Sequence, residues 1–329
     1  MASFMGHLVP FFLLVGCGWA AVRVRLVSPD AIGALNAFVL FFGLPAMLFR
    51  LGASGALLQA GLPALLWVYG LGGVLITSLA LGLGQRAGWS HRDTGLVALA
   101  TAFPNTGFLG LPLLTGLLGA QAAGPVAATL VIDVLLLSSL CLAWSHQGDG
   151  AGWRAWLGAP LRGALRNPLL WSMACGVGWW ALDVAMPRAI DDTLRLLGQA
   201  ASPAALFTLG AILARAQLRA RADAQAGMAP HEGRLQATLV AGKLLLHPAL
   251  VCALGQAMQA AGVALKPADL TTLVMAAALP SASNVSMLAE REGADTARIA
   301  RLIMWTTALS WLTLAAWAAW RGVSPAGLP

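Results

Sequence analysis

The stretch ALATAFPNTG at residues 98–107 places Pro104 in the middle of a long apolar segment, directly after a run of small residues. Proline has no N–H to donate to the carbonyl four residues earlier, and it biases the residue before it away from the helix. A helix that runs through this segment should therefore break at Pro104. Asn105 and Thr106 follow the proline at once, so polar side chains are expected beside the break.

A second stretch of the same kind, AAALPSASN at residues 276–284, lies in the second half of the chain. Pro280 again follows small residues, and Ser281, Ser283 and Asn284 come after it. In lipid, backbone groups released by a break need another partner, so such breaks are tolerated only inside protein or beside a water-filled cavity. The two breaks together predict one buried site. The alternative for each break is an ordinary proline kink that nearby polar residues repair.

The composition around these stretches is that of a membrane protein. Of the 329 residues, 59% are hydrophobic and only 10% are charged, and the mean hydropathy is +0.77. An ordinary soluble domain carries about 25% charged residues. Because about 20 helical residues cross a hydrocarbon core, charges and turn residues divide the chain into ten predicted helical spans. These are 4–22, 31–50, 62–84, 94–118, 122–144, 168–186, 192–213, 236–262, 269–289 and 298–320.

The basic residues predict how these spans are oriented. Cytoplasmic loops carry an excess of Lys and Arg, and the odd-numbered loops hold 14 of the 20 basic residues, against 5 in the even-numbered loops and the termini. We therefore expect a multi-pass protein of the cell membrane with both termini outside. Since the net charge of +7 is spread over short loops, no nucleic-acid partner is expected.

A nine-residue sequence occurs twice. PAMLFRLGA at residues 45–53 recurs as PAALFTLGA at 203–211, identical at seven of nine positions. Because the copies lie in the second and seventh spans, the two halves would insert upside down relative to each other, as in many secondary transporters. This interpretation gives a first five-helix repeat over 1–150 and an inverted second repeat over 151–329. The alternative is convergent packing of helices rich in Ala and Gly.

The two breaks also predict the chemistry of the site. If the broken helices cross at mid-membrane, the N-terminal ends of their second halves present N–H groups and a partial positive charge. This favours a small organic anion such as a carboxylate. The predicted substrate-binding residues are Asn105, Thr106, Ser281, Ser283 and Asn284, with Asn36 and Gln199 on the second and seventh spans. No metal and no cofactor are expected.

Asp133 and Lys243 are the charges that lie deepest in apolar sequence. An unpaired charge at the centre of a bilayer costs at least ~2.5–3.5 kcal/mol, so each needs a partner. One interpretation is that Asp133, alone or with Lys243, couples the movement of protons or sodium to transport. The other is structural: a buried ion pair, or a Lys243 side chain that extends to the cytoplasmic face.

An intramembrane enzyme is the alternative from a different class. Aspartyl chemistry needs two carboxylates, but the interior of the spans offers only Asp133. A serine mechanism has His247 but no nucleophile motif such as GxSxG. We therefore expect no enzyme. A channel is a further alternative, although paired inverted breaks favour alternating access.

The proline motifs resemble those of the auxin efflux carrier family in its bacterial form. PNTGFLGLP at 104–112 and LPSASNV at 279–285 carry the resemblance, with support from NAFVLFFGLP at 36–45 and KLLLHP at 243–248. The resemblance implies an all-α carrier of ten transmembrane helices in two inverted five-helix repeats, similar to the fold of bile-acid symporters and sodium/proton antiporters. The resemblance also implies organic anions as substrates: auxin in plants, and the malonate- or malate-type carboxylates proposed for bacterial members.

The resemblance also implies how such a carrier moves. A transport part slides like an elevator against a scaffold, and Pro104 and Pro280 mark the crossover of its broken helices. The scaffold would come from helices within 4–53 and 168–213, and the transport part from helices within 62–144 and 236–320. Where plant members carry a glutamine this chain has Ser281, which argues against auxin itself. The expected partners are the organic anion, protons or sodium, the lipid bilayer and a second copy in a homodimer.

Overall fold

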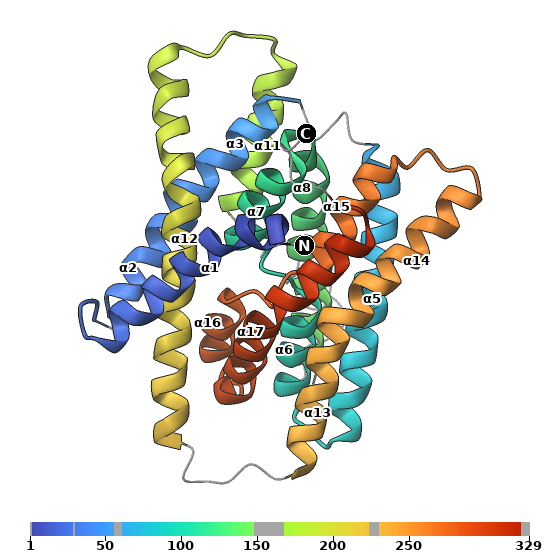
Figure 1. Cartoon of the computed structure of the whole chain (residues 1–329). Coiled ribbons are helices and arrows are strands. Elements are labelled where there is room, and N and C mark those ends of the chain that lie inside the picture. The colour runs from blue at the N-terminus through green and yellow to red at the C-terminus, as the bar shows by residue number, and fades with distance from the viewer. Residues whose placement is uncertain (1, 29, 56–60, 148–167, 224–229, 324–329) are drawn as a thin grey trace.

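The computed structural model describes residues 2–28, 30–55, 61–147, 168–223 and 230–323 (Figure 1). These residues form helices and no named β-strand. The helices are α1 (Ala2–Arg23), α2 (Ala31–Phe38), α3 (Leu44–Ala53), α5 (Leu62–Arg86), α6 (His91–Ala102), α7 (Leu111–Leu118), α8 (Ala123–Ile132), α9 (Ser138–Ser145), α11 (Pro168–Ala181), α12 (Arg188–Asp223), α13 (Pro230–Ala241), α14 (His247–Ala260), α15 (Pro267–Ala277), α16 (Asn284–Glu292) and α17 (Thr296–Trp320). Most of the predicted hydrophilic stretch 145–167 lies outside the described residues.

Four π-helical turns occur within these helices. Val39–Gly43 joins α2 to α3, Asp133–Leu137 joins α8 to α9, Gly242–Leu246 joins α13 to α14, and Thr106–Gly110 leads into α7. Such turns add one residue to a helical turn and are frequent at functional sites. Three of the four contain a polar residue that the sequence singles out, namely Thr106, Asp133 or Lys243.

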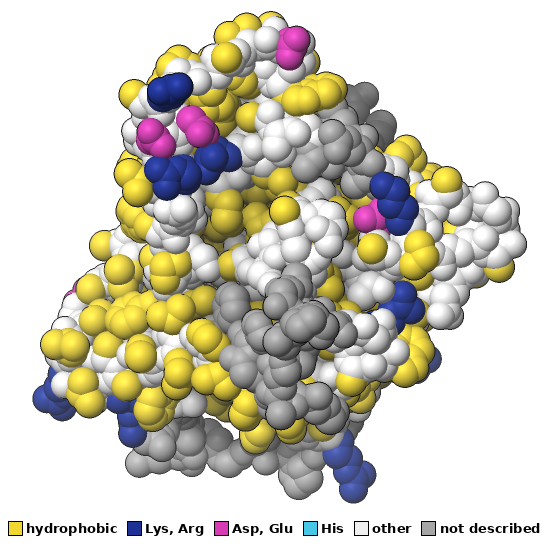
Figure 2. All heavy atoms as spheres, turned by 45° about the horizontal axis from the view of Figure 1, so that its top comes forward, with side chains coloured by type: hydrophobic (Ala, Val, Ile, Leu, Met, Phe, Trp, Pro, Cys, Tyr) yellow, Lys and Arg dark blue, Asp and Glu magenta, His cyan; other side chains and the backbone are white. Residues whose placement is uncertain are grey.

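Six helices of the described chain are long and apolar enough to cross a membrane. They are Ala31–Ala53, Leu62–Arg86, Ala120–Ser145, Arg188–Arg215, Glu232–Ala260 and Thr296–Trp320. Figure 2 shows hydrophobic side chains over the flank of the molecule, with charged side chains gathered toward its edges. The all-α membrane class expected from the composition is confirmed. Ten transmembrane helices in two inverted repeats remain a prediction.

Two close crossings hold α1 against α12 and α3 against α11. A Cβ atom on Gly210 of α12 would overlap the carbonyl oxygen of Val15 in α1, and a Cβ atom on Gly52 of α3 would lie 2.5 Å from the carbonyl oxygen of Met173 in α11. Only a residue without a side chain lets two helix backbones approach so closely. Gly52 and Gly210 occupy the same place in the two nine-residue copies, so the repeated sequence makes the same kind of contact twice.

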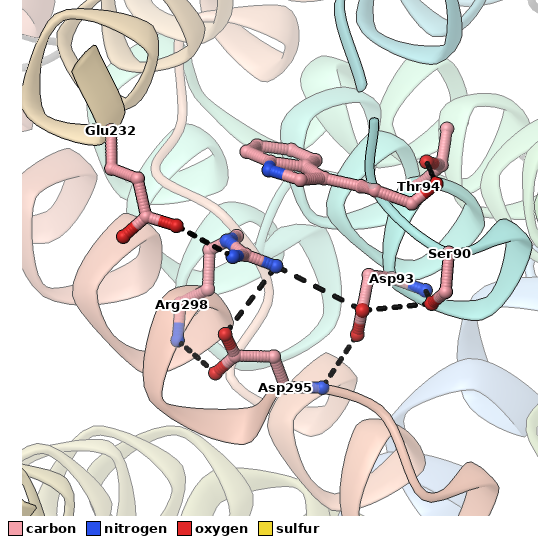
Figure 3. A network of polar contacts seen from close by, with 7 residues as sticks. Ser90, Asp93, Thr94, Glu232, Asp295 and Arg298 are labelled. Carbon is pink, nitrogen blue, oxygen red and sulfur yellow. Dashed lines mark hydrogen bonds and ion pairs between the residues drawn. The ribbon is translucent and has the colours of Figure 1, made fainter. Parts of the chain in front are cut away.

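At one end of the molecule, Arg298 connects the first turns of three helices (Figure 3). Asp295 caps α17 by accepting a hydrogen bond from the Arg298 N–H at 2.9 Å. The Arg298 guanidinium reaches Glu232 of α13 at 2.9 Å, and Asp93 of α6 accepts the Asp295 N–H at 2.7 Å. Helix beginnings that lie far apart in the sequence are thereby joined into one unit.

Candidate functional site

The two chain segments that interrupt the helices pair with each other. One lies between α6 and the π-helical turn before α7, and the other lies between α15 and α16. The Asn105 N–H donates to the Pro280 carbonyl at 2.8 Å, and the Ala282 N–H donates to the Phe103 carbonyl at 3.0 Å. The pairing is antiparallel and is centred on Pro104 and Ser281. Backbone groups without helical partners thus satisfy each other, as burial requires.

Three polar side chains at this pairing have buried atoms without a hydrogen-bond partner among the described residues. They are both amide atoms of Asn105, the hydroxyl of Ser281 and the amide oxygen of Asn284. Asn105 is 1% exposed and Ser281 is fully buried. Because buried polar side chains in native proteins are nearly always hydrogen-bonded, this group has the capacity to bind a polar solute.

A cavity of about 600 Å³ opens beside the first break. Pro104, Asn105, Thr106 and Asn284 line it, together with apolar residues of the π-helical turn Val39–Gly43, of α3 and of α11, such as Leu40, Leu44 and Leu169. One face of α16 continues the lining from Asn284 to Arg291. Seven residues of helix span about 10 Å, so the Arg291 backbone lies well away from the break, and this arginine marks another part of the cavity.

Two helix beginnings at the site have no side-chain cap among the described residues. The π-helical turn that starts at Thr106 follows Asn105, and α16 starts at Asn284 after Ser283, yet neither Asn105 nor Ser283 makes a capping hydrogen bond with its side chain. The N–H groups at a helix beginning carry a partial positive charge of about half an elementary charge. The arrangement therefore suits a negatively charged group without a fixed cation.

The other predicted binding residues lie outside this cavity lining. Ser281 and Ser283 are buried at the second break, and Ser281 donates its N–H to the Thr306 hydroxyl of α17 at 3.2 Å. Asn36 is buried in α2, and Gln199 is exposed on α12. The structure thus brings five of the seven predicted binding residues together at the two breaks, while Asn36 and Gln199 lie on other helices.

Asp133 is fully buried and bonded directly to the first break. Its carboxylate accepts hydrogen bonds from the Tyr69 hydroxyl of α5 at 3.0 Å and from the Thr106 hydroxyl at 3.1 Å. Hydrogen bonds to a charged group stabilise by about 1.5–3 kcal/mol, and here they offset part of the cost of burying the carboxylate. Thr106 therefore contacts both the cavity and the buried charge.

Lys243 lies at the second break and does not extend to a membrane face. It is fully buried, and its ammonium group donates to the Ala277 carbonyl at 3.1 Å and lies 3.3 Å from His247 Nδ1. The hydrogen bonds of Lys243 and Asp133 go to other groups, and no ion pair joins the two side chains within the described part of the chain. The extended-lysine interpretation is therefore wrong in this structure.

Three residues that contact the buried polar groups at the two breaks were not predicted from the sequence. They are Tyr69, which bonds to Asp133, Thr306, which bonds to Ser281, and His247, which lies beside Lys243. The sequence did contain a reason to single out Tyr69. It is the single tyrosine of the chain and lies in the middle of an apolar segment, whereas tyrosines of membrane proteins favour the interface. The sequence gives no reason to single out Thr306, because a threonine hydroxyl within an apolar helix ordinarily hydrogen-bonds to a carbonyl of the preceding turn.

Comparison with known proteins identifies the kind of protein to which this site belongs. A profile described as "Membrane transport protein" matches residues 3–148 and 153–318, which include both breaks. The chain belongs to this family, that of the auxin efflux carriers. It is a multi-pass membrane protein of a transporter family, and the resemblance seen in the sequence is confirmed.

Relatives of this transporter come from bacteria and plants. A Rhizobium meliloti protein named "Putative malonate transporter" is 29% identical over 319 residues, covering 95% of this chain and 94% of that protein. "Uncharacterized transporter YfdV" of Escherichia coli is 26% identical, covering 88% and 89%. "Auxin efflux carrier component 8" of Arabidopsis thaliana is 21% identical, covering 63% of this chain and 70% of that protein.

Proposed function

We propose that this transporter is a secondary carrier for a small organic anion, whose carboxylate binds where the two broken helices pair. The observation that supports this most is the group of buried polar atoms of Asn105, Ser281 and Asn284 that find no hydrogen-bond partner in the described part of the chain. Of these atoms, the Asn105 amide nitrogen and the Ser281 hydroxyl can donate to carboxylate oxygens, whereas the amide oxygens of Asn105 and Asn284 can only accept. The two uncapped helix beginnings favour negative charge.

The carrier moves by alternating access of the elevator type. The cavity lies between the broken helices on one side and the π-helical turn Val39–Gly43, α3 and α11 on the other, which is where a transport part would slide past a scaffold. The equivalent contacts of Gly52 and Gly210 support two inverted repeats, because the second span packs on the sixth as the seventh packs on the first. This leaves α5–α9 and α13–α17 as the moving part.

Malonate is the first substrate to test. The name of the Rhizobium meliloti relative points to it. The purified protein in proteoliposomes loaded with unlabelled malonate should show saturable counterflow of radiolabelled malonate, whereas a channel shows none.

The same assay tests the site. Asn105→Ala removes two of the unpartnered atoms and should lower counterflow at least tenfold while the melting temperature changes little, because no protein hydrogen bond is lost. Gln85→Ala, an exposed position in the last turn of α5, is the matched control. Full counterflow by Asn105→Ala would exclude this site.

The second candidate is a coupled carrier, in which the movement of protons or sodium drives the movement of a solute. The solute of such a carrier need not be a carboxylate. The observation that favours it is the direct bond between Asp133 and Thr106, since a change in the charge of Asp133 would act on the cavity lining. Uptake driven by imposed pH and sodium gradients separates the candidates. Loss of gradient dependence in Asp133→Asn would favour coupling through Asp133.

We also propose an orientation in the membrane and an oligomeric state. The basic odd-numbered loops face the cytoplasm, both termini lie outside the cell membrane, and two copies form a homodimer. A reporter fused after Pro329 that is active only in the cytoplasm would overturn this orientation. Cross-linking in native membranes tests the dimer.

A further inference from the structure

A second hollow lies between α14 and α17, and it shares no lining residue with the cavity at the breaks. Its volume is about 690 Å³, and the residues that line it recur at helical spacing over 245–256 and 312–320. One face of each helix therefore forms one wall of what we call the α14–α17 groove. Both walls belong to helices that are long and apolar enough to cross a membrane. A groove on such helices meets the acyl chains of the bilayer.

The α14–α17 groove has room for a slender apolar chain. Three alanines, Ala249, Ala253 and Ala316, line it beside the larger side chains of Leu312 and Trp320, which are 61% and 62% exposed. Because an alanine side chain is a single methyl group, space for a chain of methylene groups is left between the larger side chains. Sites of ~300–1,000 Å³ hold small-molecule ligands, so the volume is sufficient for an acyl chain.

A guanidinium group lies beside this groove. Arg321 is the residue directly after α17. Its Nη1 lies 3.7 Å from the Cys252 sulfur, and its guanidinium carbon lies 5.8 Å from the centre of the Trp320 ring; both of these residues line the groove. Its Nη2 and Nε donate to the Thr271 hydroxyl of α15 at 2.9 and 3.3 Å. The side chain of Arg321 is thereby held in place by three helices.

The charge of Arg321 has no acidic partner in the part of the chain that the structure describes. Its three polar contacts go to one hydroxyl and one sulfur atom. A guanidinium has five N–H donors in a planar fork that matches the oxygens of a phosphate, so two donors are left for an anion. Because Arg321 follows a candidate membrane span that ends at Trp320, the phosphates of lipid headgroups are the anions that the bilayer supplies nearby.

We infer that the α14–α17 groove binds an anionic phospholipid, with an acyl chain between the two helices and its phosphate on Arg321. The inference does not depend on which solute the protein transports, since Arg321 is absent from the lining of the cavity at the breaks. A lipid bound in this way contacts α14 and α17 together, and through Arg321 it also stabilises the contact with α15. It should therefore stabilise the folded protein.

The wild-type protein in detergent tests the lipid directly. Its melting temperature should rise saturably, by several degrees, as phosphatidylglycerol is added to the micelles. Phosphatidylcholine should give a smaller rise, because its choline group offsets the phosphate charge, and inorganic phosphate should give none. Equal rises with the two lipids would overturn the inference, and so would a rise with inorganic phosphate alone that matches the one with phosphatidylglycerol.

Two variants test the two parts of the site. Arg321→Gln should lose the difference between the two lipids, whereas Arg86→Gln, an exposed position in the last turn of α5, is the matched control and should keep it. Ala253→Leu fills the groove and should reduce the response to both lipids. Ala257→Leu, at an exposed alanine of α14 outside the groove, should leave this response unchanged. A wild-type response in Arg321→Gln would contradict the phosphate contact.

A measurement on the wild type alone covers the case in which Arg321→Gln does not fold. Native mass spectrometry of protein equilibrated with equal amounts of the two lipids should show phosphatidylglycerol retained after most phosphatidylcholine has left. Equal retention of both lipids would overturn the inference.

Discussion

Thr106 connects the cavity to the buried charge cluster. The Thr106 hydroxyl donates a hydrogen bond to the Asp133 carboxylate at 3.1 Å. Thr106 also lines the cavity and is the first residue of the π-helical turn after the first break. A π-helical turn offsets the side chains that follow it relative to an α-helix. One residue thus brings together backbone break, substrate cavity and charge.

We predict that Thr106→Val lowers the stability of the protein by about 1.5–3 kcal/mol, the usual worth of a hydrogen bond to a charged group. Valine keeps the shape of threonine but cannot donate to Asp133. Thr106→Ser keeps the hydroxyl and is the control. Thermal unfolding in detergent measures both, and equal melting temperatures for the two variants would show that the hydroxyl does not stabilise Asp133.

At the scale of helices, the repeated nine-residue sequence is a packing motif. Gly52 of α3 contacts Gly176 of α11. At the other crossing, Gly210 of α12 packs on α1, and Gly18 of α1 lies against the Phe207 carbonyl of α12. Glycine on both sides of each crossing permits close backbone contact. The two crossings explain why Gly is kept in register in both copies.

Gly210→Ala should destabilise the protein by about 1–3 kcal/mol, because the added methyl group overlaps the Val15 carbonyl and forces α1 and α12 apart. Gly178→Ala in α11 is the matched control, since a Cβ atom there meets nothing within 4 Å and alanine favours the helix by about 1 kcal/mol. Chemical or thermal unfolding measures the difference. The packing account would fail if both variants were stabilised alike.

At the scale of the whole molecule, the cavity is a boundary between two groups of helices. Leu44 of α3 faces Gly107 across it: a Cβ atom on Gly107 would lie 3.6 Å from the Leu44 side chain. By contrast, Met47 and Gly198 lie within the proposed scaffold, where a Cβ atom on Gly198 would lie 3.5 Å from the Met47 Cβ. An elevator would separate the first pair and leave the second unchanged.

Cross-linking therefore tests the motion. In a background without the four native cysteines, Leu44→Cys with Gly107→Cys, joined by a short bifunctional methanethiosulfonate reagent, should stop malonate counterflow, and dithiothreitol should restore it. Met47→Cys with Gly198→Cys, treated alike, should keep transport. Undiminished counterflow in the first cross-linked protein would exclude sliding at this boundary.

The sequence predicts some of these features much better than others. Pro104 and Pro280 can be interpreted without a structure because a missing N–H is a local property of the chain. Asp133 and Lys243 are conspicuous because their surroundings are apolar. Their partners depend on helices from distant parts of the chain, so neither the Tyr69 bond nor the Ala277 bond follows from spacing.

The pairing of the two breaks has a consequence for how this family could diversify. The bonds that hold the segments together run between main-chain atoms of Asn105, Pro280, Ala282 and Phe103, and a main-chain bond survives most side-chain substitutions. Selection can therefore alter the side chains at positions 105, 281 and 284 to suit a new solute without dismantling the architecture that presents them.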